Sequence, residues 1–203
     1  QVLCEDFSGV TFAPTNWNIE FTGTNYWTRN TVSAYLIGAG SAKFDFWTAS
    51  AGTVQSLVSL AFGSSIAGDS LKFDYSYAPY TTVTSIDTMT IETSTNGGTT
   101  YSTLVRYKGS TNDTIGNANT LKTTAALGSA FTPTLANQWL TKKVALPVGT
   151  NKVKFRARSG FGNNLYIDNP CKFNNSAPVP ATITFAAQGY FDTLNTKLNI
   201  RDS

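Results

Sequence analysis

Hydrophobic and polar residues alternate along several short segments of this chain, and turn-forming residues separate those segments. In 71–77 an aromatic residue occupies every second position from Phe73 onward, and 153–158 alternates apolar residues with lysine and arginine. A period of two is typical of a half-buried β-strand. The same pattern predicts further strands at 42–47, 56–60, 89–93 and 100–105.

The connections between these segments favour antiparallel pairing. Asn96-Gly97-Gly98 separates two predicted strands, and this kind of turn needs positive φ, which glycine adopts without strain. No segment of ten or more residues has a convincing amphipathic helical pattern. The predicted fold class is therefore all-β, an antiparallel two-sheet sandwich.

Long polar segments suggest the domain limits. Residues 108–134 form either a functional loop or an ordered excursion over the sandwich. We predict one domain at 1–173, a linker at 174–180 and a strand-like C-terminal tail at 181–203. The tail has two apolar sets, namely Ile183, Phe185 and Ala187, followed by Leu194, Leu198 and Ile200.

Composition excludes several classes of chemistry. The chain has no histidine, so neither a Ser-His-Asp nor a Cys-His nucleophile can form, and the commonest zinc ligand is missing. Charged residues make up only 13%, and the net charge is +3. The alternating cations of 152–158 predict a solvated strand face, with a nucleic-acid groove as the less favoured alternative. The other cations are scattered, so we expect no nucleic-acid partner. No apolar run approaches 18 residues, so we expect no membrane span.

The two cysteines, Cys4 and Cys171, stand near opposite ends of the predicted domain. We favour a disulfide between them over two free thiols. Such a bond would make the first and last strands neighbours, bring Glu5 close to Asp168, and indicate an oxidising compartment. Because the chain begins with Gln1, we interpret this residue as a mature N-terminus exposed by signal cleavage, and we expect a secreted or cell-surface protein.

An ordered set of short motifs resembles a known group of domains. The motifs are Phe73-Asp74-Tyr75-Ser76-Tyr77-Ala78-Pro79-Tyr80, Ile86-Asp87-Thr88-Met89, Phe131-Thr132-Pro133 with Trp139, and Gly162-Asn163-Asn164-Leu165-Tyr166-Ile167-Asp168-Asn169. Over about residues 3–173 the chain resembles the MAM-like, cleaved-adhesin or choice-of-anchor domains of secreted Bacteroidota-type surface proteins. The resemblance implies a jelly roll and an extracellular role, but no single ligand. Asn169-Pro170-Cys171 departs from the pattern and predicts an early end to the last strand.

Calcium is the cofactor that these sequence features favour. If the cysteines are bonded, Glu5, Asp6 and Asp168 should converge, and the resembling domains often hold a cation near their paired terminal strands. Carboxylate oxygens are suitable ligands for Ca²⁺. We therefore predict a structural Ca²⁺ site there. The alternative is that these acids lie on the surface or accept hydrogen bonds from loop amides.

Aromatic residues provide the candidate glycan contacts. Trp27 and Tyr80 lie among threonine- and asparagine-rich loop residues, and we predict that both are exposed to sugars. Trp17, Trp47, Tyr75 and Tyr77 are expected in the core. Thr114, within Asp113-Thr114-Ile115 in a long loop, resembles an O-glycosylation acceptor of exported Bacteroidota proteins.

These features predict a non-catalytic protein. Glycosidases need two carboxylates in one cleft, and the sequence gives no cue for such a pair; Asp74, opposite the aromatics of its strand, is expected at the surface. The first hypothesis is a structural or adhesive subunit that self-assembles with identical subunits, its tail adding a strand to a neighbour's sheet. The alternative is a carbohydrate-binding or adhesin module processed from a larger secreted protein.

Overall fold

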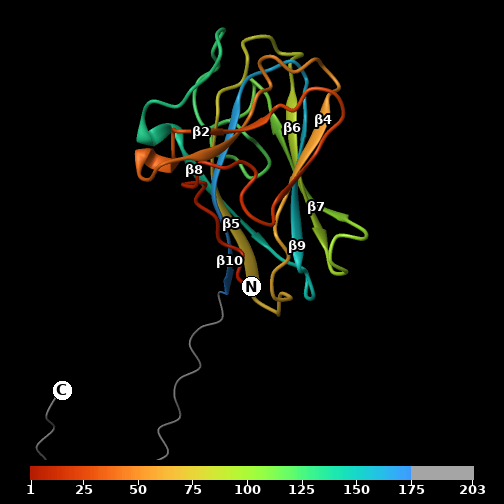
Figure 1. Ribbon diagram of the computed structural model, residues 1–203. Helices are drawn as coiled ribbons and strands as arrows, with labels where there is room; N and C mark the ends of the chain where they lie inside the picture. Colours follow the sequence, from red (N-terminus) through yellow and green to blue (C-terminus); the bar gives the residue numbers. More distant parts are fainter. Residues whose placement is uncertain (175–203) are drawn as a thin grey trace, which may run out of the picture.

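The computed structural model describes residues 1–174, which form a sandwich of two five-stranded antiparallel sheets (Figure 1). One sheet has the order β1-β4-β9-β6-β7 and the other β2-β3-β10-β5-β8. The predicted all-β, two-sheet class is confirmed. The strands are β1 (Asn18–Glu20), β2 (Trp27–Asn30), β3 (Ser41–Phe44), β4 (Val54–Val58), β5 (Asp69–Tyr77), β6 (Asp87–Ser94), β7 (Ser102–Gly109), β8 (Leu140–Ala145), β9 (Lys152–Arg158) and β10 (Leu165–Asn174).

Helical structure in this part of the chain is limited to two short 3-10 turns, η1 (Ala34–Leu36) and η2 (Ala136–Gln138). Within residues 1–174, no helix is long and apolar enough to cross a membrane.

The main core lies between the sheets and is built from the alternating positions. Phe73 of β5 meets Phe155 of β9 edge to face across the sandwich, with ring centroids 5.5 Å apart. Both rings are fully buried, as are Tyr75 and Tyr77. Lys72, which precedes Phe73, is exposed, whereas the intervening Asp74 and Ser76 are buried on the other face of the sheet. The period of two therefore correctly predicts which residues of these strands enter the core.

A second, smaller core lies on the other face of the sheet that contains β10. Tyr166 of β10 packs against Phe131 and Trp139, and its hydroxyl donates a hydrogen bond to the Phe131 carbonyl oxygen (3.0 Å). The long segment 108–134 is thus an ordered excursion over the sandwich, one of the two alternatives that its length suggested.

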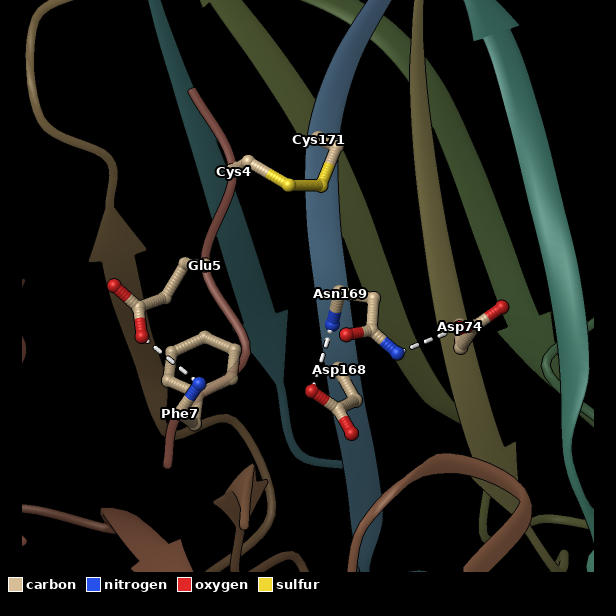
Figure 2. The surroundings of a disulfide bond; sticks show 7 residues. All are labelled: Cys4, Glu5, Phe7, Asp74, Asp168, Asn169 and Cys171. Carbon is tan, nitrogen blue, oxygen red and sulfur yellow. Dashed lines mark hydrogen bonds between the residues drawn. A yellow bond between two sulfur atoms is a disulfide. The ribbon is translucent and has the colours of Figure 1, made fainter. Parts of the chain in front are cut away.

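The predicted disulfide between Cys4 and Cys171 is present (Figure 2). The N-terminal segment runs beside β10, where the Lys172 amide donates to the Leu3 carbonyl (2.8 Å). The bond joins residues 167 positions apart, so the chain-entropy model gives a stabilisation of about 5 kcal/mol. The N-terminal segment therefore lies beside the last strand and forms one isolated bridge with it at Cys4 and Cys171, but the expected pairing of the first and last strands is wrong, because β1 lies in the other sheet.

The predicted early end of the last strand is wrong. β10 continues to Asn174, and its register against β5 shifts between Asp168 and Cys171. This irregularity accommodates Asn169, whose φ is 51°, and Pro170, which has no N–H to donate. A bulge therefore absorbs the residues that would otherwise interrupt the strand.

Two further expectations have different outcomes. Asp74 is buried, not at the surface, and it accepts hydrogen bonds from the Thr141 hydroxyl (2.5 Å) and from Asn169 Nδ2 (2.9 Å). The tail assignments, Ile183, Phe185, Ala187, Leu194, Leu198 and Ile200, lie outside the described residues, as does the linker beyond Asn174.

Candidate functional site

Three aromatic side chains, Trp47, Tyr80 and Phe161, together with Gly162, line a surface cavity of about 210 Å³. The Trp47 and Tyr80 rings meet edge to face, with centroids 5.7 Å apart and planes at 72°. Phe161 is 56% exposed, whereas Trp47 and Tyr80 are half-buried. We call these three residues the aromatic pocket.

Strand register explains why residues so far apart in sequence meet here. Phe44 of β3 and Tyr77 of β5 both pair with Leu165 of β10, on its two sides. Trp47 and Tyr80 each follow their paired residue by three positions, and Gly162 precedes Leu165 by three. The three loops therefore leave one row of the sheet side by side, and the pocket forms at that end of the sandwich.

A buried carboxylate fixes the loop that carries Phe161. Asp87 Oδ1 accepts hydrogen bonds from the amides of Gly160 (2.8 Å) and Gly162 (3.1 Å). Its Oδ2 accepts from the Asn163 amide (2.8 Å) and from the Tyr77 hydroxyl (2.9 Å). Asp87 has no exposed surface, so one side chain organises the whole 160–163 turn from beneath.

Glycine is needed on both sides of Phe161. A Cβ on Gly162 would overlap the Asp87 carboxylate, and one on Gly160 would overlap the Ile86 backbone. Phe161 itself has φ 61°, a conformation that is uncommon for non-glycine residues. The close approach of the backbone to Asp87 therefore turns the Phe161 side chain outward.

The electrostatics of the turn reflect its burial. Loss of solvation raises the pKa of Asp87 to about 6, although the amides of Gly160, Gly162 and Asn163 and the Tyr77 hydroxyl partly oppose this. Burial, reinforced by the adjacent Asp87 charge, raises the Tyr77 pKa well above its ordinary value. The turn is thus held by a carboxyl group that titrates near pH 6.

Asn163 and Asn164 connect the turn to the loops around it. Asn163 accepts a hydrogen bond from the Phe131 amide (2.7 Å) and donates to the Leu127 and Ser129 carbonyls (3.2 and 2.9 Å). The Asn164 side chain accepts from the Trp47 amide (3.4 Å) and donates to the Phe131 carbonyl (3.1 Å). Side-chain hydrogen bonds therefore support the loops of the pocket, in addition to the strand register that places them side by side.

The structure revises the aromatic assignments. Trp27, predicted to be exposed, is fully buried with its ring 5.1 Å from that of Phe44. Trp47, expected in the core, is only half-buried and lines the pocket with Tyr80. Trp17, Tyr75 and Tyr77 lie in the core as expected. Loop-like composition misplaced Trp27, which pairs with Phe44 in the sheet. The general burial of aromatic residues misplaced Trp47, which lies beyond the end of β3.

Phe161 and Asp87 were not predicted as site residues. A signal exists in Ser159-Gly160-Phe161-Gly162-Asn163, because an aromatic residue between two glycines is typical of a turn that presents a side chain. The partner of that turn lies some 75 positions earlier in the chain, since the Gly162–Asp87 hydrogen bond has that sequence separation. Only the fold brings them together.

The three predicted calcium ligands do not form one ligand set. Glu5 accepts a hydrogen bond from the Phe7 amide (2.8 Å), and Figure 2 shows its carboxylate turned away from Asp168. Asp6 accepts from the Ser8 amide (3.0 Å). Asp168 accepts from the amides of Ala34 and Asn169, each at 2.7 Å. Across residues 1–174 no group of three acidic or cysteine side chains is placed to hold a metal ion. Calcium binding itself stays a prediction.

The protonation of these acids follows their surroundings. Burial raises the pKa of Asp168 to about 6 despite its two backbone donors, and burial also raises the pKa of Glu5. Hydrogen bonds from Ser8 lower the pKa of Asp6. Thr114, the predicted O-glycosylation residue, is exposed in its loop, and its modification also stays a prediction.

Comparisons with known proteins identify the fold. No protein-family model matches the sequence, and no curated protein matches it. Among solved structures, the K1 cleaved adhesin domain of Lys-gingipain from Porphyromonas gingivalis W83 superposes with a TM-score of 0.59 at 16% identity, over 86% of this chain and 99% of that domain. The K2 domain gives 0.57 at 18% identity, over 85% and 99%. The K3 domain gives 0.52 at 19% identity, over 84% and 97%. At the level of the fold, this supports the cleaved-adhesin part of the resemblance.

Proposed function

We propose that this chain is a non-catalytic, extracellular sugar-binding module of the adhesin type, and that the aromatic pocket is its binding site. The observation that carries the proposal is the convergence of Trp47, Tyr80 and Phe161, from three separate loops, on one open cavity. This is the alternative hypothesis from the sequence, with a site that keeps Tyr80 of the two predicted glycan contacts and omits the buried Trp27.

The pocket has the chemistry that a neutral sugar requires. The C–H faces of a sugar ring pack on aromatic rings, which offer a large apolar area at small entropic cost. Trp47 and Tyr80 stand at a steep angle and form a corner, and the exposed Phe161 supplies a third wall. The cavity volume of about 210 Å³ is below the range of roughly 300–1,000 Å³ typical of drug-sized ligands. We therefore expect one sugar residue, or the end of a glycan chain, to enter it.

Two further observations support the extracellular and adhesive parts of the proposal. The Cys4–Cys171 disulfide is of a kind that persists in oxidising compartments. The fold is also that of domains described as cleaved adhesins.

The test is a neutral-glycan array probed with the wild-type protein, Phe161→Ala and Phe21→Ala, followed by calorimetry on the best ligand. Phe21 is a suitable control because it is 47% exposed, near the value of Phe161, but lines a different cavity. We expect Phe161→Ala to weaken binding about tenfold or more and Phe21→Ala to leave it unchanged. Binding to no neutral glycan, or equal binding by wild type and Phe161→Ala, would contradict the proposal.

A further inference from the structure

The solvent-facing side of β9, β6 and β7 forms a second surface, which carries cations instead of the aromatic rings of the pocket. Thr88 of β6 pairs with Arg158 of β9 on one side and Lys108 of β7 on the other. Two residues along, Thr90 pairs with Arg156 and Arg106 in the same way. Directly paired residues share a face of a sheet, so each threonine lies between two cations. We call Arg106, Lys108, Arg156 and Arg158 the basic face.

The side chains confirm this orientation. Met89, Ile91, Tyr107, Phe155 and Ala157 occupy the alternate positions, and all are buried in the core. On the face away from the core, Arg106 Nε donates a hydrogen bond to Thr90 Oγ1 (3.4 Å). Arg106, Lys108 and Arg158 are exposed, and Arg156 is half-buried.

No residue of the basic face forms an ion pair in the described part of the chain, although Glu20 and Glu92 line a cavity beside Arg156. Within residues 1–174 there are three ion pairs, and none includes a member of the basic face. The adjacent row of the sheet pairs Glu92 with Lys154, and Lys154 also contacts Glu20 (2.8 Å). Arginine forks match carboxylate and sulfate oxygens in geometry, so three arginines and one lysine on one sheet face, without ion pairs among the described residues, favour an anionic ligand.

An open cavity of about 720 Å³ borders the basic face and adds hydrogen-bonding groups. Arg106, Lys108, Asn117, Asn119 and Thr120 contribute to its lining. One acid, Asp113, also lies there, and it accepts hydrogen bonds from Thr120 Oγ1 (2.8 Å) and the Ser110 amide (3.3 Å). The cations can pair with the acid groups of a ligand, while the neighbouring amides and hydroxyls hydrogen-bond to the hydroxyl groups of the same ligand.

We propose that the basic face and its bordering cavity bind an acidic polysaccharide through the carboxylate or sulfate groups of the polymer. No aromatic ring lines this cavity, whereas single-stranded nucleic acids are usually held by bases stacked on aromatic rings. The choice of a polysaccharide over a nucleic acid also rests on the sugar-binding function proposed above. The two sites then serve one kind of polymer by different chemistry, aromatic packing for neutral residues and ion pairing for acidic ones.

The experiment measures binding of heparin, polygalacturonate, neutral dextran and single-stranded DNA at several salt concentrations. Arg156→Gln/Arg158→Gln removes two charges from the basic face. Lys72→Gln/Lys143→Gln is the matched control, because it removes two paired, exposed charges from the other sheet and leaves the same net charge.

We expect both acidic polysaccharides to bind and dextran not to bind at this face. Arg156→Gln/Arg158→Gln should weaken heparin binding about tenfold and reduce the salt dependence to about half, since two of four cations are lost. The control should bind as the wild type does.

Absence of binding to both acidic polymers overturns the proposal. So does an equal loss in both double variants, because binding would then follow net charge alone, and so does tighter binding of DNA than of heparin at the same ionic strength. Neutral-glycan binding separates the two proposals. If the basic face has a function but the aromatic pocket has none, no neutral glycan binds the wild type, while the wild type and Phe161→Ala bind heparin equally.

Discussion

The aromatic pocket and the basic face are built in opposite ways. The pocket is assembled from loops, and its central turn depends on hydrogen bonds to one buried carboxylate, Asp87. The basic face consists of side chains on three regularly paired strands, whose positions follow from backbone pairing alone. A site on regular strands tolerates side-chain changes without losing its geometry, whereas a loop site can be lost through a single residue that contacts no ligand.

The change expected to separate the two regions most strongly is Asp87→Asn. Asparagine offers one acceptor oxygen, so in either orientation at least one backbone N–H of the turn loses its partner and faces an NH₂ group. We expect a loss of about 3 kcal/mol in the free energy of unfolding, measured by urea denaturation. At temperatures where the variant is folded, neutral-sugar binding should fall while heparin binding is kept.

The control for Asp87→Asn is Asp45→Asn. Asp45 takes part in a partly exposed ion pair with Lys43 (3.1 Å), and its loss should cost less than about 1 kcal/mol. Equal effects of the two substitutions would show that the buried network does not anchor the turn.

Gly162→Ala tests the same turn without removing a charge. The added methyl would overlap the Asp87 carboxylate, and we expect a loss of about 2 kcal/mol in stability together with weaker neutral-sugar binding. The matched change is Gly23→Ala, which has positive φ but open space around the new atom and should cost about 1 kcal/mol. A thermal-melting series that ranks Gly23→Ala as the more damaging change would contradict the packing described here.

The pH dependence of stability tests the role of Asp87 in the turn of the aromatic pocket. Because the folded pKa of Asp87 is about 6 and its ordinary value is 3.8, the folded protein takes up the proton first. The contribution of Asp87 to the free energy of unfolding is therefore larger at low pH and declines as pH rises from 4 to 6. Asp168, whose pKa is also about 6, acts in the same direction.

We expect the free energy of unfolding to fall between pH 4.5 and 7, by about 2 kcal/mol from Asp87 alone. The chain contains no histidine, so no imidazole titration masks this trend. No residue of the basic face hydrogen-bonds to Asp87 or Asp168 in the described structure, so heparin binding should stay constant over this range. Urea denaturation at both pH values, with a stability that rises toward pH 7, would refute the assignment.

The smallest effect is expected for Arg156→Gln/Arg158→Gln on stability. Neither arginine is in an ion pair with any residue of 1–174, so unfolding should change by less than about 0.5 kcal/mol although heparin binding falls. A large loss of stability, measured in the same urea series, would show that these arginines are structural.

The sequence predicts these two regions to different extents. The alternation of 153–158 correctly identifies a strand with cations on its outer face, because the period of two depends only on local geometry. The fold class and the Cys4–Cys171 pairing were predictable for similar reasons, namely repeated alternation and the absence of other cysteines.

The aromatic pocket was not predictable in the same way. Its members meet because Phe44, Leu165 and Tyr77 share one row of a sheet, and no local pattern specifies that register. Trp27 and Trp47 were exchanged between core and surface, because loop-like composition misplaced the first and the general burial of aromatic residues misplaced the second. The calcium prediction placed Glu5 and Asp168 near one disulfide but could not indicate that backbone amides would satisfy their carboxylates.

The most direct test of the aromatic pocket follows the tryptophan indole N–H signals by NMR while the best neutral glycan from the array is added. The protein has four tryptophans, and Trp17, Trp27 and Trp139 are buried, each with an indole nitrogen that has no hydrogen-bond partner within the described structure. We predict a saturable shift of the Trp47 signal, with the other three nearly unchanged. Saturation of binding without a shift at Trp47 would show that the sugar binds elsewhere and would contradict the proposed site.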